Sequence, residues 1–513
     1  MLRSAAKLVL PVLLLASCAT TPSPSPGSSA ETQSAALSTT SPLPSATGAA
    51  VGVPTPFPTP APPPASGVTA WPQTIATDRD FAPVFAADGT GFYVTGGEDA
   101  QLVAFDRGGH TKPGWPIEEG PGADFGSPAV GRDGSAYVEE CAGPRIGCVL
   151  HKFDHTGRDV SGWPVGIPTA FACSNEGRCM PNALDIGPDG TIFVSHWREA
   201  GGLQVLAIGA SGSIKPGWPI ASSTAGVYWN NQQVASDGTL VILSLPDGSE
   251  TSASIAAFGP DGRSPTGWPV SVPDHSNYVL GPQGTVVIWS LIDDVGELCS
   301  NPRRTVFTVL DPDGRTLPGW PRGSTGYASA PVVDSEGTVY YVSATHKVYA
   351  HDRVGEVKAD WPVGVPGAAD GCDPESPHLA PDGTVVVVGD EVVALSPDGL
   401  SLPGWPYRPA GSLVGPCFDS ECTGGHQAPA FGPDGTVYLV VYHGETGNVR
   451  AEVVAIDRRG QIKAGWPYRL PFDANTVSIA AVTVSPDGRV VVRSGGSSQF
   501  VLLALDADGR LAR

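Results

Sequence analysis

Nine tryptophans in this chain are each followed directly by proline, and these pairs recur at intervals of 41 to 61 residues. They begin at Trp71, Trp115, Trp163, Trp218, Trp268, Trp320, Trp361, Trp405 and Trp466. Intervals of this size are typical of propeller blades and other stacked supersecondary units. Since only three of the twelve tryptophans lie outside the pattern, tryptophan serves the architecture of this chain before it serves any site.

Each repeat carries two further landmarks besides Trp-Pro. A turn of the Asp-Gly-Thr type, such as Asp434-Gly-Thr, precedes an apolar run, and a glycine turn such as Asp457-Arg-Arg-Gly460 precedes the tryptophan. Acidic-glycine pairs between short alternating apolar runs are hairpin signals. One unit therefore predicts four strands: A before the acidic-glycine turn, B after it, C ending at the glycine turn, and D carrying Trp-Pro. Four antiparallel strands repeated around a ring form a β-propeller.

The two ends of the repeat region complement each other. The last unit stops at Arg513, where Trp-Pro would follow, and the region begins with Val68 to Pro72, which contains Trp-Pro. We expect this N-terminal segment to supply the missing outer strand and so close the ring, which removes exposed sheet edges. The expected fold is all-β, a single propeller of nine four-stranded blades, with eight blades as the alternative. Proline after the tryptophan suits an outer edge strand because proline lacks an amide donor.

The N-terminal sequence has the pattern of an export signal. Arg3 and Lys7 precede the apolar run 8–15, and the run ends in Leu15-Ala-Ser-Cys18. This tetrapeptide resembles the lipobox of bacterial lipoproteins, which implies cleavage before Cys18, lipidation of Cys18 and an extracytoplasmic, lipid-anchored location in the cell envelope. An ordinary secretory signal is the alternative. We expect a signal peptide at 1–17, a Pro/Ser/Thr/Ala-rich linker at 18–66 that cannot bury a core, and the propeller at 67–513.

The net charge of −21, without a lysine or arginine cluster, disfavours nucleic acid as a partner. Eight cysteines remain besides Cys18, an even number that predicts disulfides in an exported chain. Three pairs are close in sequence, and Cys299 and Cys372 are left over; zinc held by Cys417, Cys422 and His426 is the rival for one pair. The close pairs are Cys141–Cys148, Cys173–Cys179 and Cys417–Cys422.

In such a blade the A–B and C–D turns leave on one face of the ring, and the B–C and D–A connections leave on the other. All eight cysteines and the long, irregular connections fall on the second face, here called the loop-rich face, where binding is expected. Polar and aromatic residues gather where strand A starts at this face and could bind a ligand, although a merely solvated channel entrance is the alternative. The candidate ligand-binding residues are Trp229, Asn231, His275, Asn277, Glu375, His378, His426 and Gln427.

The spacing Ala104-x-Asp106…Gly109…Trp115, repeated as Ala455-x-Asp457…Gly460…Trp466, resembles the tryptophan-docking repeat of the dehydrogenases that use pyrroloquinoline quinone (PQQ) and of their cofactor-free propeller relatives. The resemblance implies, for the enzymes, adjacent cysteines that form a disulfide over the quinone and a calcium site with an acidic base. This chain has no adjacent cysteines. We therefore expect no cofactor, with PQQ and calcium left open.

The sequence contains no nucleophile elbow, no P-loop and no zincin motif. The leading expectation is a monomeric, non-catalytic envelope lipoprotein that binds a protein or another cell-surface macromolecule through its loop-rich face and contacts the membrane only through its lipid. In organisation it resembles the propeller lipoproteins of the outer-membrane barrel-assembly machinery. The alternatives are a quinoprotein-like or carbohydrate-active enzyme, and a carbohydrate-binding lectin.

Overall fold

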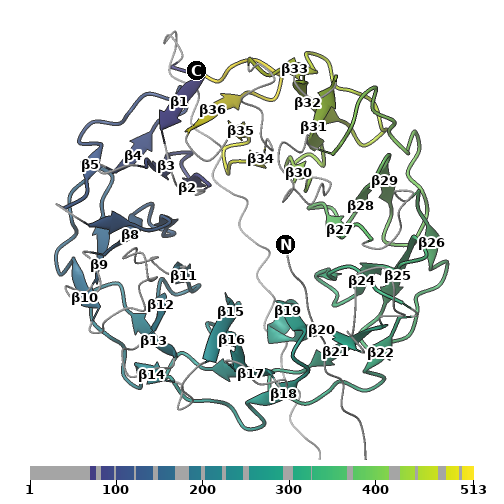
Figure 1. Ribbon diagram of the computed structural model, residues 1–513, viewed down its shortest axis with the longest axis horizontal. Coiled ribbons are helices and arrows are strands. Elements are labelled where there is room, and N and C mark those ends of the chain that lie inside the picture. Colours follow the sequence, from purple (N-terminus) through teal and green to yellow (C-terminus); the bar gives the residue numbers. More distant parts are fainter. Residues whose placement is uncertain are drawn as a thin grey trace, which may run out of the picture. The chain divides into compact units, whose positions relative to one another are not determined.

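The chain from Ala70 to the C-terminus forms nine antiparallel sheets arranged around a ring (Figure 1). The computed structural model describes residues 70–513 except 77–81, 97–99, 121–122, 142–147, 168–183, 198–202, 222–226, 247–252, 293–303, 325, 367–373, 415–427, 445–448, 472–480 and 496–498. The fold is a nine-bladed β-propeller, as the repeat predicts, and not an eight-bladed one. The helical content of the described residues is one 3₁₀ turn, Pro282–Gly284, and none of their helices could span a membrane.

The blades are numbered here from the first complete unit, and their strands run outward from the channel. Blades 1 to 3 contain β2 (Val84–Phe85), β3 (Gly91–Val94), β4 (Gln101–Phe105) and β5 (Ile117–Glu118); β6 (Asp124–Phe125), β7 (Ala129–Val130), β8 (Ala136–Cys141), β9 (Cys148–Phe153) and β10 (Val165–Ile167); and β11 (Leu184–Ile186), β12 (Ile192–Trp197), β13 (Leu203–Ile208) and β14 (Ile220–Ala221). Blades 4 to 6 contain β15 (Val227–Val234), β16 (Leu240–Pro246), β17 (Ala253–Phe258) and β18 (Val270–Val272); β19 (Ser276–Leu280), β20 (Val286–Ile292), β21 (Arg304–Leu310) and β22 (Arg322–Gly323); and β23 (Val332–Val333), β24 (Val339–Val342), β25 (Lys347–His351) and β26 (Val363–Gly364). Blades 7 to 9 contain β27 (Pro377–Leu379), β28 (Val385–Val388) and β29 (Val392–Leu395); β30 (Ala430–Phe431), β31 (Val437–His443), β32 (Arg450–Ile456) and β33 (Tyr468–Arg469); and β34 (Ala481–Val484), β35 (Val490–Gly495), β36 (Gln499–Leu505) and β1 (Gln73–Ala76).

The ring closes as the sequence predicts. Strand β1 pairs antiparallel with β36 as the outer strand of blade 9, in a register that runs from Gln73↔Leu502 to Ala76↔Gln499. Two blades depart from the regular four strands. In blade 2 the inner strand is split into β6 and β7, and in blade 7 the fourth strand is reduced to a single bridge between Val392 and Tyr407.

The hydrophobic core lies between neighbouring blades. Phe92, Leu102 and Trp115 of blade 1, for example, pack in one buried cluster with residues of blade 2 such as Val138 and Phe153. The strands B and C of each blade supply most of these side chains because both of their faces are covered by adjacent sheets. Each blade is therefore stabilised chiefly by its two neighbours.

The tryptophans dock each blade on the next one. Trp-Pro lies immediately before the outer strand, as Trp115-Pro116 does before β5, and not within the strand as the sequence suggested. All nine indoles are buried, and eight of them donate their Nε1–H to a backbone carbonyl in the C–D turn of the following blade. The contacts, 2.9 to 3.4 Å long, are Trp71–Arg107, Trp163–Ala210, Trp218–Pro260, Trp268–Pro312, Trp320–Arg353, Trp361–Pro397, Trp405–Arg458 and Trp466–Ala507.

The glycine before tryptophan allows this close approach. Gly404 has a φ of 86°, a conformation that L side chains rarely adopt, and a Cβ there would collide with the carbonyl oxygen of Arg459 in the C–D turn of blade 8. The Gly-Trp-Pro signature thus combines a backbone that can lie against the next turn, an indole that binds it, and a proline that ends the turn before the outer strand.

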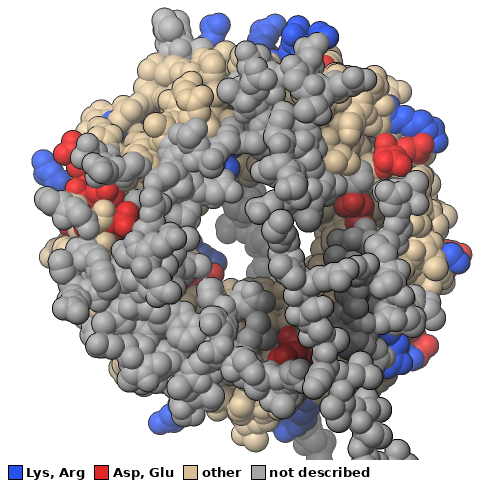
Figure 2. Space-filling view, in the orientation of Figure 1, with Lys and Arg blue, Asp and Glu red and all other residues tan. Residues whose placement is uncertain are grey.

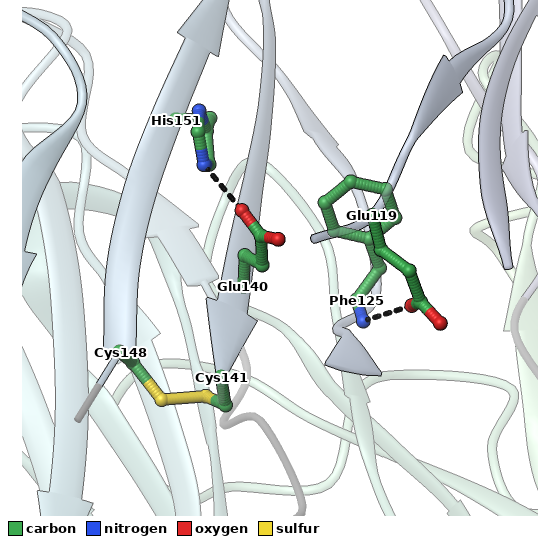
Figure 3. Close-up of a disulfide and its surroundings, with 6 residues drawn as sticks. All are labelled: Glu119, Phe125, Glu140, Cys141, Cys148 and His151. Atoms are coloured by element: carbon green, nitrogen blue, oxygen red, sulfur yellow. Dashed lines mark hydrogen bonds and ion pairs between the residues drawn. A yellow bond between two sulfur atoms is a disulfide. The ribbon is translucent and has the colours of Figure 1, made fainter. Parts of the chain in front are cut away.

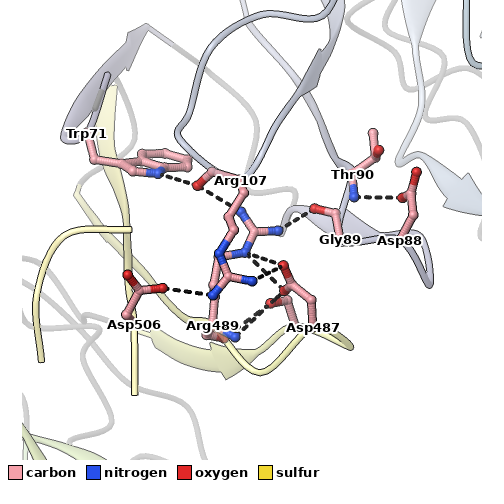
Figure 4. Close-up of polar contacts among 9 residues, drawn as sticks. Trp71, Asp88, Gly89, Thr90, Arg107, Asp487, Arg489 and Asp506 are labelled. Atoms are coloured by element: carbon pink, nitrogen blue, oxygen red, sulfur yellow. Dashed lines mark hydrogen bonds and ion pairs between the residues drawn. The ribbon is translucent and has the colours of Figure 1, made fainter. Parts of the chain in front are cut away.

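The junction between blades 9 and 1 carries an additional polar clasp (Figure 4). Arg489 is fully buried; it donates to the carbonyl oxygens of Gly89 and Arg107 in blade 1 and to the carboxylate of Asp487 in its own blade, the last at 2.9 Å. The carbonyl of Arg107 also accepts the indole N–H of Trp71. Arg489 stands where most other units have threonine after Asp-Gly, so the clasp is a departure from the repeat at the seam.

Arg107 completes the clasp from the side of blade 1. Its guanidinium binds Asp487 at 3.1 Å and Asp506 at 2.8 Å, both in blade 9. Burial by itself would raise the pKa of Asp487, but a hydrogen bond from Ser485 and the charges of Arg489 and Arg107 outweigh burial and lower the pKa. The carboxylate therefore stays ionised between two guanidinium groups.

We expect Arg489→Met to lower the free energy of unfolding by about 3–5 kcal/mol, because it leaves Asp487 buried with only one charged partner. Urea unfolding followed by tryptophan fluorescence measures the change. Arg510→Met is the matched control, since the Arg510 side chain is 84% exposed in the same blade and should change stability by less than about 0.5 kcal/mol. Equal effects of the two substitutions would contradict a role for the clasp in closure.

The docking hydrogen bond can be tested with one tryptophan that lacks it. The indole nitrogen of Trp115 has no partner among the described residues, whereas that of Trp268 donates to Pro312 at 2.9 Å. Trp→Phe removes similar area at both sites, so Trp268→Phe should cost about 1 kcal/mol more than Trp115→Phe. Thermal melting of the two variants checks the difference, and a larger loss for Trp115→Phe would sink the interpretation.

Candidate functional site

The two faces of the ring differ in what their connections do. The C–D turns hold the tryptophans of neighbouring blades, so this face, here called the turn face, is committed to keeping the ring together. The connections on the loop-rich face are longer, and most of their residues lie outside the described part of the chain. The candidate residues outside the described part include Cys173, Cys179, Cys299, Cys372, Cys417, Cys422, His426 and Gln427. Cys18, near the N-terminus, also lies outside it.

Cys141 and Cys148 form the disulfide that their spacing predicts (Figure 3). They are directly opposite each other in the register of β8 and β9, at the loop-rich end of blade 2. The buried Glu139 carboxylate lies within 4.8 Å of both sulfurs. Because the sulfurs are bonded to each other, neither is a thiolate that could bind a metal.

A histidine bonded to two carboxylates lies on the same hairpin as this disulfide, and Figure 3 shows its contact with one of them, Glu140. His151 Nε2 is 2.8 Å from Glu140 and Nδ1 is 3.1 Å from Asp159. Glu140 also accepts the backbone N–H of Gly120, which precedes β6. Burial by itself would lower the pKa of His151, but the two carboxylates outweigh it and raise the pKa. Because each ring nitrogen contacts a carboxylate, His151 on β9 is joined to Glu140 on β8 and to Asp159. This arrangement leaves the imidazole poorly placed to act as a general base.

The candidate ligand-binding residues fall into separate places. Asn231 and Asn277 come together, with Asn231 Nδ2 donating to Asn277 Oδ1 at 2.9 Å. His275 is exposed just before β19. Glu375 and His378 lie at the start of blade 7, where burial lowers the pKa of His378 and Glu375 partly opposes that shift. The backbone of Trp229 belongs to β15, but its side chain lies outside the described part of the structure.

Asn231 and Asn277 belong to a cluster that crosses three blades. It consists of Asp185 on β11, Asn231, Gln232 and Gln233 on β15, and Asn277 and Tyr278 on β19, and is here called the polar wall. These three strands are the innermost strands of blades 3, 4 and 5 and border the opening at the centre of the ring (Figure 1). Figure 2 shows the opening, with acidic side chains visible beside it.

Strand β15 reaches both of its neighbours through amide side chains. Toward β19, Asn231 donates to the carbonyl of Tyr278 at 3.1 Å, and Gln233 accepts the N–H of Leu280 at 3.1 Å. Toward β11, Gln232 Nε2 donates to Asp185 Oδ2 at 2.5 Å. The polar wall therefore joins three blades near the channel by hydrogen bonds.

The Asp185 side of the polar wall is incompletely satisfied. Gln232 is 7% exposed, and its Oε1 has no hydrogen-bond partner among the described residues. Burial raises the pKa of Asp185, and the hydrogen bond from Gln232 opposes the shift only in part. A buried acceptor without a partner is unusual in a folded protein.

Sequence reasoning found Asn231 and Asn277 but missed Asp185, Gln232 and Gln233. The signal was present in the aligned units, because the position six residues before the Asp-Gly turn is Ala or Ser in seven blades and Asn only at 231 and 277. The next position is proline in five blades, yet Gln232 and Tyr278 occupy it in blades 4 and 5. The polar wall is thus built from departures from the repeat.

The similarity of this chain to known proteins is weak. No protein-family model and no curated protein matches the chain. Among solved structures, it is similar to BamB from Moraxella catarrhalis (14% identity, covering 84% of this chain and 98% of BamB, TM-score 0.40). It is also similar to a eukaryotic initiation factor (10% identity, 81% and 95% covered, TM-score 0.44) and to a streptogramin B lyase (14%, 63% and 93%, TM-score 0.33). Because these similarities are weak, the class rests on the chain's own topology: a nine-bladed, tryptophan-docked β-propeller.

The charged link at His151 predicts a pH dependence of stability. The pKa of His151 is raised in the folded state. Its ion pairs therefore contribute fully to stability below the unfolded-state pKa of about 6.5, and this contribution is lost as pH rises through the folded-state pKa. We expect His151→Gln to remove this loss, so that its melting temperature changes less than that of the wild type between about pH 6 and pH 9. His155→Gln, in an exposed turn of the same blade, should keep the wild-type profile; a His151→Gln profile parallel to the wild type would disprove the link.

Proposed function

We propose that this chain is an envelope-anchored, non-catalytic propeller lipoprotein that binds a protein or another macromolecule through its loop-rich face. The observation that carries the proposal is the division between the two faces. On the turn face, backbone carbonyls of the C–D turns are used by the indoles of neighbouring blades. The loop-rich face carries the variable connections and a disulfide, and it is free of this docking role.

The side-chain contacts of the described residues support binding rather than catalysis. His151 has both nitrogens engaged by carboxylates, and the two sulfurs near Glu139 are joined in a disulfide. The residues also do not fit the quinone of the PQQ enzymes, because that site uses adjacent cysteines and this disulfide joins residues seven apart across a hairpin. The proposal therefore includes no cofactor.

The N-terminal sequence supports the proposed anchor. Lipidation of Cys18 would attach the chain to the membrane, and the Pro-rich residues up to 66 would act as a spacer. Since one lipidated cysteine of a bacterial lipoprotein carries more than one acyl chain, it is a stable anchor in terms of buried hydrocarbon. The partner would then be another component of the envelope or of the cell surface.

Site-specific photocrosslinking in the native host tests the proposal. A photoreactive residue placed at His275 or Glu375 on the loop-rich face should give one discrete adduct, whereas placement at the exposed Arg263 or Leu400 of the turn face should give none. Cys18→Ala should move the chain out of the membrane fraction and weaken the adduct, because membrane tethering raises the local concentration of the partner.

Two results would contradict the proposal. An adduct formed from the turn-face positions alone would assign the wrong face. A Cys18→Ala chain that still partitions with the membrane would remove the lipoprotein anchor, whichever face forms the adduct.

A further inference from the structure

Two cations on the turn face of blade 8 are each paired with a carboxylate. Arg458, in the C–D turn, reaches the preceding blade and binds Asp382 at 3.0 Å. Lys463 binds Asp434 of the acidic-glycine turn at 2.9 Å and donates to the Thr436 hydroxyl at 3.0 Å. Blade 8 therefore shows how the repeat neutralises an arginine and a lysine at these two positions.

Blade 6 has the same two cations, Arg353 and Lys358, without these carboxylate partners. Gln283 takes the place of aspartate in the preceding blade, so Arg353 meets an amide oxygen there, at 3.4 Å, and forms no ion pair with a described residue. Lys358 forms neither an ion pair nor a side-chain hydrogen bond within the described part of the chain. The positive charges of both side chains are therefore left without the neutralisation seen in blade 8.

The carboxylates near these cations do not replace the missing partners. Asp334 Oδ1 accepts the N–H groups of Glu336 and Thr338, so the turn is closed without the exposed Glu336 carboxylate, which forms no ion pair among the described residues. Asp352 Oδ1 accepts two N–H groups of its own turn, as Asp457 does in blade 8. Compared with blade 8, this region of blade 6 thus lacks one carboxylate and leaves another unpaired.

A single cavity brings the two cations of blade 6 together. It has a volume of about 280 Å³ and lies between the A–B and C–D turns. The Arg353 side chain crosses the A–B turn, since a Cβ added to Gly337 would lie 2.9 Å from the Arg353 Cγ. Val354, which is 51% exposed, gives the cavity an apolar surface. The lining residues are Glu336, Thr338, Asp352, Arg353, Val354 and Lys358.

We propose that this cavity binds a small organic carboxylate, with its charged group between Lys358 and Arg353 and its apolar part against Val354. The planar guanidinium can donate to both oxygens of a carboxylate, and the ammonium adds a second positive charge. The ligand would supply the negative charge that aspartates supply in blade 8. An anion with two charges, such as phosphate, is disfavoured because Glu336 and Asp352 border the same cavity.

The site is independent of the loop-rich surface proposed for the macromolecular partner. It lies on the turn face, and it uses the side chain of Arg353, whereas Trp320 binds the backbone carbonyl of that residue. A ligand can therefore enter without disturbing the docked indole. Either assignment can fail without the other.

The test is titration calorimetry of the full-length chain with acetate, butyrate and inorganic phosphate at constant ionic strength. We expect butyrate to bind more tightly than acetate, because its longer chain covers Val354, and Lys358→Met to weaken butyrate binding at least tenfold. Lys463→Met is the matched control. It removes the equivalent lysine of blade 8, which is already paired with Asp434, and should change the dissociation constant less than twofold.

Two further variants test the missing charge itself. Gln283→Asp gives Arg353 the carboxylate that Asp382 gives to Arg458, so it should weaken butyrate binding at least threefold. Glu336→Gln removes a competing carboxylate and should strengthen binding. The proposal is overturned if neither carboxylate binds the wild type, if phosphate binds more tightly than butyrate, or if Lys358→Met and Lys463→Met have equal effects.

Discussion

The contact between an indole and the next blade's C–D turn is the interaction on which the rest of this structure depends. A four-stranded blade is too thin to bury both of its faces by itself, so its stability comes from its neighbours. Each docked tryptophan buries a large apolar surface, and eight of the nine satisfy their N–H on a backbone carbonyl of the next blade. Repetition of this contact around the chain allows nine blades to close with a regular angle.

The closure of the ring adds a demand that the repeat alone does not meet. In every other blade the strands follow one another along the chain, but the outer strand of blade 9, β1, comes from the N-terminal end and is joined to β36 by strand pairing alone. The clasp of Arg489 and Arg107 around Asp487 lies at this junction. Its buried charges are compensated from both blades, so the loss of one partner would leave a buried charge uncompensated.

The use of one face for docking leaves the other for function. The turn face is uniform because each of its turns must present a carbonyl and a glycine to a neighbour. The loop-rich face has no such obligation, and the channel can change residue by residue as long as the inner strands still pair. The disulfide at the end of β8 and β9 and the polar wall on β11, β15 and β19 are both placed where the repeat imposes least.

The sequence by itself determined the fold class, the nine blades, the strand order and the closing strand, because Trp-Pro, Asp-Gly and glycine-turn signals act locally and recur with a period. It also indicated Cys141–Cys148, whose short spacing suits a hairpin. Only the tertiary structure decided which residues meet across blades: Asp185 with Gln232, and Arg107 with Asp487, are separated by 47 and 380 residues. Such pairs depend on the rotation of one blade against the next, which no local signal encodes. For the same reason the sequence indicated Asn231 and Asn277 as polar candidates but not as a bonded pair. It also gave no sign that Arg489, at an Asp-Gly turn, bonds to the next blade.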